Sequence, residues 1–421
     1  EGGSERGMTG ALAMATGMTV PPSFPLPTSA VWWDQQRLQF LVSLAVFYPS
    51  ADCVPRTVRL TCGITVAVLL WANTILSVFV LDIYPSKRSI AACTDFCHSM
   101  CSLASHAVLV YLLETRGLGK IVSRPGTEDM RESMQSFNQR ARRWLLRLPL
   151  LLYPALGLTW WVTHCGQWLP QGIIGQRYGR MALICWSLNT LTAWVWYSGP
   201  VCVMMLMSSV LCVHEAMLDN LQRRIVQGML PSFAAPLYDR VVTSVNEAGS
   251  ELQNVVGFIL MCSMLAFATL VTSLLSQNGE VGFGPAAAYS AEEVRVVLQT
   301  TVLIGTTIVT VTQGARFTSK AGRLELCANS RLLSADICDS LRESLAVQQI
   351  IRRTGGWLVW GVRVDNATMV KILSIYGAGA YYMVTVCVRT AQSTPRNTPS
   401  ASLTQGEALL REVTPALRAG G

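Results

Sequence analysis

Long apolar runs alternate with shorter polar segments along this chain. Seven of the runs approach or exceed the roughly 20 apolar residues that a helix needs to cross a bilayer. They cover residues 60–81, 90–113, 144–166, 182–211, 254–276, 294–315 and 367–388. The fourth run is the longest and predicts a helix that continues beyond the membrane. An eighth run, from Leu38 to Tyr48, is too short to span and predicts an interfacial helix before the first span.

Two of the polar segments between the runs, 212–253 and 316–366, carry helical periodicity of their own. Their apolar residues recur three or four positions apart: Leu218, Leu221 and Ile225; Leu237, Val241 and Val245; Leu341 and Leu345. This spacing places each group on one face of a helix. We therefore expect that the membrane helices are prolonged into these two segments and that the prolonged parts pack against one another or against other subunits.

Composition favours a membrane protein over a soluble one. The 421 residues are 51% hydrophobic and 14% charged, whereas average soluble proteins carry about 25% charged residues. The charges gather between the apolar runs, because a charge at the bilayer centre is costly. The net charge of +8 comes mostly from loop residues beside the spans rather than from one basic soluble face. We therefore expect no nucleic-acid partner.

Catalytic and metal-binding patterns are missing from the sequence. It has four histidines, no phosphate-cradling glycine loop, no zinc-spaced His/Glu pair and no Gly-x-Ser-x-Gly, so we expect neither an enzyme nor a cofactor. Cys93, Cys97 and Cys101 recur every four residues beside His98, which suggests a soft-metal site. Because one helix face cannot supply tetrahedral geometry, small interface residues are the favoured interpretation, and no metal is expected.

The distribution of basic residues predicts the orientation. The leader and the loops after spans 2, 4 and 6, together with their flanking helical turns, hold 24 of the 33 Lys and Arg residues, and cytoplasmic loops carry such an excess. The N-terminus is therefore predicted inside and the C-terminus outside, which is the inverse of G-protein-coupled receptors. The chain starts at Glu1 rather than Met, so we expect an incomplete N-terminus.

The stretch 361–388, GVRVDNATMVKILSIYGAGAYYMVTVCV, resembles the C-terminal signature of arthropod gustatory receptors. In that family a Gly and a hydrophobic-Asp turn precede the last span, which carries Ser-Ile-x-Gly-Ala, then Thr-Tyr, five hydrophobic residues and Gln-Phe. The matching residues are Gly361, Asp365, Ser374, Ile375, Gly377, Ala378 and Tyr382. Tyr381 stands at the Thr position, and Val388 and Arg389 stand at the Gln and Phe positions. The chain therefore looks like a divergent member.

The resemblance implies an all-α, multi-pass plasma-membrane protein with seven transmembrane helices, which acts as a ligand-gated, non-selective cation channel for small tastant molecules. Four identical or related subunits would surround a pore lined by span 7. The expected organisation is a flexible cytoplasmic leader (1–35), an interfacial helix and entry to the first span (36–59), spans 1–6 with the ligand pocket (60–316), a cytoplasmic helical anchor region (317–366), the pore-lining span (367–388) and an extracellular tail (389–421).

Pore and gate residues are expected on the outer half of span 7. The candidates are Tyr381, Tyr382, Val384, Thr385 and Val388. Val384 and Val388 are one helical turn apart, so both can face one axis, and apolar rings at a constriction gate ions by dewetting. Ordinary helix packing is the competing interpretation.

Ligand-binding candidates lie toward the outer ends of spans 2 to 4. They are Asp95, His98, Trp160, Trp161, His164, Trp186, Asn189 and Trp194. Aromatic walls with a few polar groups suit a small organic ligand, especially a sugar or a cation, and ionisable residues within spans are functional candidates. Aromatic belts at the membrane interface and packed polar pairs are the alternatives.

Other classes of membrane protein stay open as hypotheses. A G-protein-coupled receptor needs an outside N-terminus, and a secondary transporter would show internal symmetry or substrate-coupled flux. A membrane enzyme has no supporting residues. The sequon Asn366-Ala367-Thr368 falls inside in the predicted topology, so it should carry no glycan.

Overall fold

The computed structural model describes residues 35–49, 54–82, 89–115, 155, 179–280, 291–334, 341–352 and 355–393. This part of the chain is nearly all helical. Its helices are α2 (Gln35–Val46), α3 (Arg56–Asp82), α4 (Ser89–Glu114), α10 (Arg180–Val226), α11 (Pro231–Glu280), α12 (Ala291–Ser334), α13 (Leu341–Arg352) and α14 (Asn366–Ser393). Two short strands, β1 (Leu358–Val359) and β2 (Val362–Arg363), pair in an antiparallel hairpin. The predicted all-α architecture is confirmed.

Six of the seven predicted spans coincide with helices: α3, α4, α10, α11, α12 and α14. The third, 144–166, lies outside the described residues. Four helices contain stretches long and apolar enough to cross a membrane: Arg56–Ile75, Phe96–Glu114, Thr190–Val226 and Ser250–Thr272. The described residues of α12 and α14 contain no stretch of this kind, and α14 carries Lys371.

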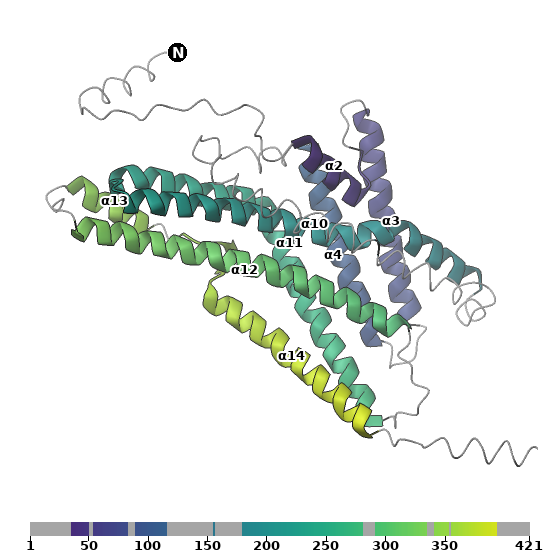
Figure 1. Ribbon diagram of the computed structural model, residues 1–421. Helices are drawn as coiled ribbons and strands as arrows, with labels where there is room; N and C mark the ends of the chain where they lie inside the picture. The colour runs from purple at the N-terminus through teal and green to yellow at the C-terminus, as the bar shows by residue number, and fades with distance from the viewer. Residues whose placement is uncertain are drawn as a thin grey trace, which may run out of the picture.

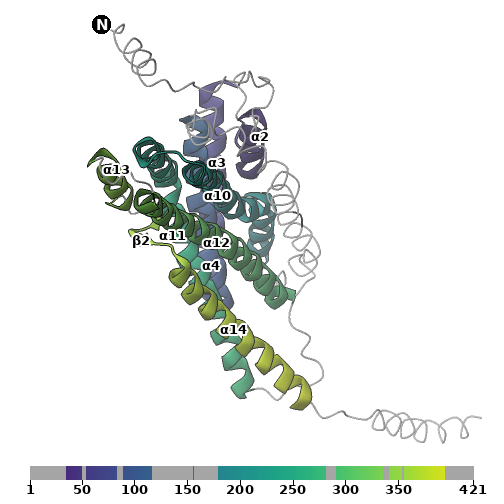
Figure 2. The same ribbon diagram turned by 60° about the vertical axis from the view of Figure 1, so that its left-hand side comes forward.

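Three helices are much longer than a bilayer is thick. The lengths of α10, α11 and α12 are 47, 50 and 44 residues. At about 1.5 Å per residue each exceeds twice the roughly 30 Å of the hydrocarbon core. The prediction of a continuous helix running on from the fourth span is therefore confirmed. The prolonged parts lie side by side with α13 at one end of the molecule (Figures 1 and 2).

We call this end, residues 212–253 and 316–334 with α13, the extension bundle. Its core contains the predicted apolar stripes of α10 and α11, with Leu218, Ile225, Val241 and Val245 buried. The helix predicted near Leu341 is present as α13. The face of α13 that packs is not the expected one, because Leu341 and Leu345 are exposed. The buried apolar residues of this helix are Ala346, Val347 and Ile350.

The first helices form the other side of the molecule. An apolar stripe of α3, comprising Ile64, Val68, Trp71 and Ile75, is exposed, as expected of a face in contact with lipid. The opposite side of α3 packs on α4, where His106 Nε2 lies 3.1 Å from the carbonyl oxygen of Gly63. We call the α3 residues the lipid stripe.

The helix α2 docks on α10 through its C-terminal carbonyl groups. The indole N–H of Trp194 donates to the Leu44 oxygen at 2.8 Å, and Ser198 Oγ donates to the Ala45 oxygen at 2.5 Å. Carbonyls in the last turn of a helix have no partner within the helix. Side chains from α10 therefore complete the end of α2.

Candidate functional site

The last helix, α14, begins at a side-chain cap. Asp365 Oδ1 accepts a hydrogen bond from the Thr368 backbone N–H at 2.8 Å, which satisfies one of the free donors at the helix start. This bond lowers the pKa of the Asp365 carboxyl from its ordinary value. Asp365 therefore has a clear local role, because it fixes where α14 starts.

One face of α14 packs on α11. Ile372 and Tyr376 are buried, and the Tyr376 hydroxyl lies 2.9 Å from Ser263 Oγ. The Tyr376 ring meets Phe267 edge-on with the centroids 5.2 Å apart. Gly379 sits so close to Phe267 that any Cβ at this position would collide with the ring. The helix is held along this line at the edge of the molecule, beside α11 and α12 (Figures 1 and 2).

The exposed side of α14 carries a line of polar residues beside exposed apolar ones such as Val370 and Ile375. Lys371, Ser374, Ala378, Tyr381 and Thr385 follow one another at alternating spacings of three and four residues, which places them on one side of the helix. The first four are exposed, Tyr381 at 75%. Four of the five carry polar groups, whereas the lipid stripe of α3 is wholly apolar. We call these five residues the polar stripe; its chemistry suits water better than lipid.

The predicted gate residues fall on and beside the polar stripe. Tyr381 and Tyr382 are exposed, and Thr385 Oγ1 donates to the Tyr381 carbonyl at 2.8 Å. Val384 and Val388 belong to α14, but their side chains lie outside the described part of the structure. The gate assignment stays a prediction.

A buried polar layer lies where α3, α4 and α10 meet. Asn73 Nδ2 donates to Thr192 Oγ1 at 3.4 Å, which joins α3 to α10. His98 and Ser99 of α4 are also buried. The contact between Ser102 of α4 and Trp196 of α10 fixes the register of these two helices. His98 lies four residues before Ser102, and Thr192 lies four residues before Trp196. The predicted ligand residue His98 is therefore buried within the helix bundle at the level of Thr192.

A proline inside α10 leaves one carbonyl without its helical partner. Pro200 has no N–H, so the carbonyl of Trp196, four residues earlier, receives no bond from it. Ser102 Oγ of α4 lies 2.7 Å from this oxygen and 2.9 Å from the His98 carbonyl. Gly199 allows the close approach, since a Cβ there would already touch Ser105 at 3.4 Å. The serine of one helix thus completes the backbone of another.

The predicted tryptophans of α10 have different surroundings. Trp194 faces α2, where it contacts Phe47 with ring centroids 6.3 Å apart and donates to Leu44. Trp186 is half-buried, and its Nε1 has no hydrogen-bond partner in the part of the chain that the structure describes. The structure therefore ties Trp194 to the docking of α2 and leaves Trp186 as a candidate donor to a ligand.

The remaining ligand candidates are placed only in part. Asp95 lies on α4 and Asn189 on α10, but their side chains are outside the described part of the structure. Trp160, Trp161 and His164 lie outside the described residues altogether. The ligand pocket as a whole stays a prediction.

Sequence reasoning missed several polar residues of the layer, namely Asn73, Ser99 and Thr192. A signal for Asn73 was present, because it is an isolated amide within the apolar run 60–81. Ser99 and Thr192 give no such signal, because hydroxyl residues are frequent in membrane helices and commonly bond to their own backbone.

Thiols from two helices meet inside the bundle. Cys262 of α11 lies near Cys97 and Cys101 of α4. All three are buried, and none of them forms a disulfide bond within the described part of the chain. No group of three or more metal-ligating side chains with suitable geometry occurs among the described residues. We therefore assign these cysteines to helix packing, where they act as small apolar residues.

Charged side chains tie α10 to α12 in the extension bundle. Lys320 Nζ lies 2.8 Å from Glu215 Oε1 and also bonds to Asp219. Burial disfavours the charged form of Lys320, but the bonds to Asp219 and Glu215 outweigh it and raise the pKa of this amine. The ion pairs thus fix the register of these two helices.

Among the solved structures that share this fold are two that align over most of the chain. Both are of the insect olfactory receptor OR5 from Machilis hrabei, one of them in complex with eugenol. Each aligns with a TM-score of 0.60 and 13% sequence identity; the alignments cover 84% and 83% of this chain and 97% and 96% of the receptor. No protein-family model and no curated protein sequence matches the chain. The likeness establishes the fold, a multi-pass membrane architecture that this chain shares with the olfactory receptor.

Proposed function

We propose that this protein is a chemosensory receptor of the gustatory type, a ligand-gated, non-selective cation channel of the plasma membrane that opens to small tastant molecules. The observation that carries the proposal is the polar stripe of α14. A membrane helix that packs on one face and presents Lys371, Ser374 and Tyr381 on the other is suited to line an aqueous pathway.

A single subunit cannot enclose such a pathway with one helix. The extension bundle exposes large apolar side chains, including Leu326 and Leu333 of α12 and Leu341 of α13. Exposed apolar surface of this kind marks protein contacts. Four copies, or copies with related receptors, joined through the extension bundle would bring their polar stripes together around one axis.

Ligand binding is proposed for the region around the polar layer. Trp186 offers an indole N–H, and His98 lies at the level of Thr192 within the bundle. The neighbour OR5 was solved with eugenol, which is an aromatic molecule with a hydroxyl group. Eugenol is therefore a rational first probe, beside sugars and quaternary amines.

The test uses single cysteine substitutions and a positively charged thiosulfonate reagent. Ser374→Cys and Tyr381→Cys lie on the polar stripe, and Ile372→Cys lies on the packing face as the matched control. We expect the reagent to alter the ligand-evoked current of the two stripe variants and to leave wild type and the control unchanged.

Two outcomes would overturn the proposal in different ways. Current that is evoked by ligand but unaffected at both stripe positions would show that α14 does not line the pathway. Purified protein that binds a probe in proteoliposomes and passes no current would show that the protein is not a channel.

A further inference from the structure

The hairpin before α14 folds around a turn that is strained at one residue. Leu358 pairs with Arg363 and Val359 with Val362, so Trp360 and Gly361 form a two-residue turn. Both have positive φ, 51° and 77°, as the common two-residue hairpin turn requires. Glycine adopts this conformation freely, whereas a bulky tryptophan persists there only where its surroundings fix it.

Two glycines in neighbouring helices receive the tryptophans of this hairpin. Trp357 lies against Gly314 of α12 so closely that a Cβ at position 314 would collide with the indole. At Gly257 of α11, a Cβ would lie 2.7 Å from Trp360 Cε2 and 3.0 Å from Val359 Cγ1. Each helix therefore has a gap of one missing side chain where the hairpin enters.

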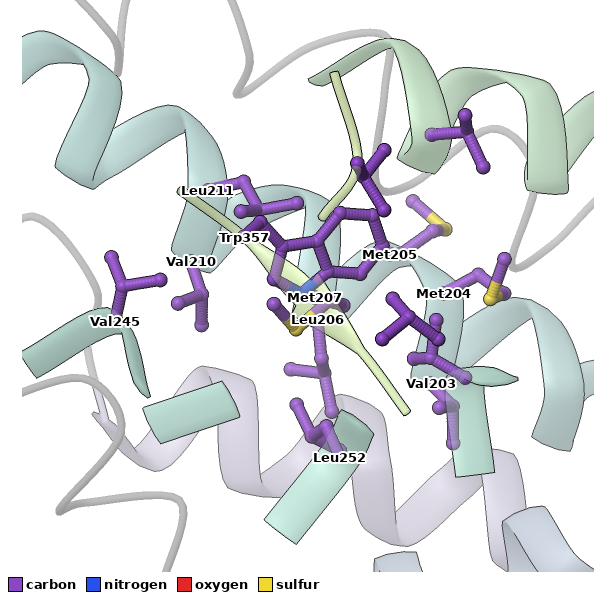
Figure 3. Packing of buried hydrophobic residues seen from close by; sticks show 14 of the residues in the cluster. Val203, Met204, Met205, Leu206, Met207, Val210, Leu211, Val245, Leu252 and Trp357 are labelled. Carbon is purple, nitrogen blue, oxygen red and sulfur yellow. The ribbon is translucent and has the colours of Figure 1, made fainter. Parts of the chain in front are cut away.

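The Trp357 side chain is buried in the core rather than at its edge. It is 1% exposed and belongs to the cluster with Met207 and Leu211 of α10 and Leu252 of α11 (Figure 3). One residue of the hairpin therefore packs among three helices at once.

Polar contacts hold the hairpin backbone to the same two helices. The Trp357 backbone N–H donates to Thr318 Oγ1 of α12 at 3.1 Å, and Gln253 of α11 donates to the Leu358 carbonyl. Arg363 Nη2 donates to the Gly355 carbonyl at 3.0 Å, closing the segment on itself. Contacts to α11 and α12 are thus both apolar and polar.

The far end of the hairpin continues into α14 without a flexible joint. Val364 N–H donates to the Trp357 carbonyl at 2.9 Å. Asp365 caps the helix at Thr368, and Thr368 Oγ1 lies 3.2 Å from the Arg363 carbonyl. Bonds therefore run from the buried Trp357 to the first turn of α14.

We propose that Trp357 and Trp360 are positioning residues for the pore helix, and that the hairpin transmits relative movement of α11 and α12 to the start of α14. The inference rests on the proposed channel function. Because the hairpin grips both helices and holds α14 by its cap, a shift of α11 against α12 must displace the first turn of α14 or break these contacts.

The test fills the two gaps and compares them with glycines that face open space. Gly314→Ala and Gly257→Ala push on Trp357 and Trp360, whereas Gly305→Ala and Gly322→Ala on α12 meet no atom within 4 Å. We expect the first pair to change the ratio of ligand-free to ligand-evoked current by about tenfold or more, with eugenol binding to purified protein unchanged. The controls should behave like wild type.

A second readout does not need current. In a Ser374→Cys background, the rate of thiol modification should differ between Gly257→Ala and Gly305→Ala, because the stripe shifts only in the former. Should wild type pass no current, the channel proposal fails and this rate still tests the positioning role.

Gly314→Ala is the stronger perturbation. If the Gly314→Ala variant does not fold, Trp360→Ala is a milder substitute, because Trp360 is half exposed. Variants at positions 257, 314 and 360 that fold and then gate and react like wild type would overturn the inference. Lowered thermal stability with unchanged gating and unchanged modification rates would also overturn it, since the hairpin would then be structural only.

Discussion

The hairpin and the polar stripe of α14 are close in sequence, but they differ in burial, in hydrogen bonding and in their contacts with other helices. Trp357 is buried and hydrogen-bonded through its backbone, whereas Tyr381 is 75% exposed. The hairpin packs against α11 and α12 at Gly257 and Gly314. Four of the five residues of the polar stripe are exposed within the described part of the chain. The difference separates a segment fixed by its own chain from a face left available to water or to other subunits.

The largest expected difference in stability is between the variants Trp357→Ala, beside the hairpin, and Tyr381→Ala, on the polar stripe. Trp357→Ala removes a fully buried aromatic side chain, which costs about 3–5 kcal/mol. Tyr381→Ala changes an exposed position and should stay within about 0.5 kcal/mol. Thermal unfolding of both variants in detergent, followed by size-exclusion chromatography, measures the contrast. Equal losses of stability would contradict the division between the two regions.

A smaller loss of stability is expected at the Trp196 carbonyl, to which Pro200 cannot donate a helical hydrogen bond. Ser102→Ala deprives the buried Trp196 oxygen of its donor, and an unsatisfied buried acceptor costs about 1–3 kcal/mol. Ser99→Ala is the matched control, because Ser99 Oγ has no hydrogen-bond partner in the described part of the structure.

The same site allows a double-mutant cycle. Pro200→Ala restores the backbone N–H, so the loss caused by Ser102→Ala should largely vanish in the Pro200→Ala background. Additive losses in the double variant would show that the serine acts by packing rather than through the carbonyl.

The smallest effect concerns pH and lies beside the hairpin. Tyr238 of α11 donates to Glu325 of α12 at 3.2 Å, and burial raises the pKa of Glu325 despite this bond. A raised carboxyl pKa means that the native state favours the protonated form. The associated stability is present below the unfolded pKa of about 4.3 and is lost as the pH rises through the folded pKa.

Glu325→Gln keeps an acceptor for Tyr238 and cannot ionise. The variant should melt at a higher temperature than wild type near pH 8, and the difference should shrink toward about pH 4. Glu251→Gln, an exposed change on α11, is the control. A difference that grows as the pH falls would contradict the assigned direction of the shift.

Much of the helical framework was predictable because apolar runs and helical spacing report it directly. The stripes at Leu218 and Val241 are buried as expected. No hairpin is predicted within 316–366, where the recognised pattern is the helical spacing of Leu341 and Leu345, because a two-residue turn has only a short signal. That signal was Gly361 next to alternating apolar residues, but the turn also places Trp360 at positive φ, against local preference.

The candidate site was less predictable than the fold. Asp365 was noted from a resemblance, and its function as a helix cap needed the observed bond to Thr368. Trp194 is a ligand candidate because aromatic walls suit a small organic ligand, and only the structure shows that its indole N–H donates to the Leu44 carbonyl. Contacts between residues far apart in sequence leave no periodic trace, so patterns along the chain cannot reveal them.

The docking of α2 has a consequence for synthesis of the chain. Its two closing bonds join residues 150 and 153 positions apart, and a ribosome adds about 5–20 residues per second. After Leu44 has been made, about 8–30 s must therefore pass before Trp194 exists. During that interval the carbonyls at the end of α2 have no partner from α10, so α2, the first described helix of the chain, cannot reach its final place until α10 has been made.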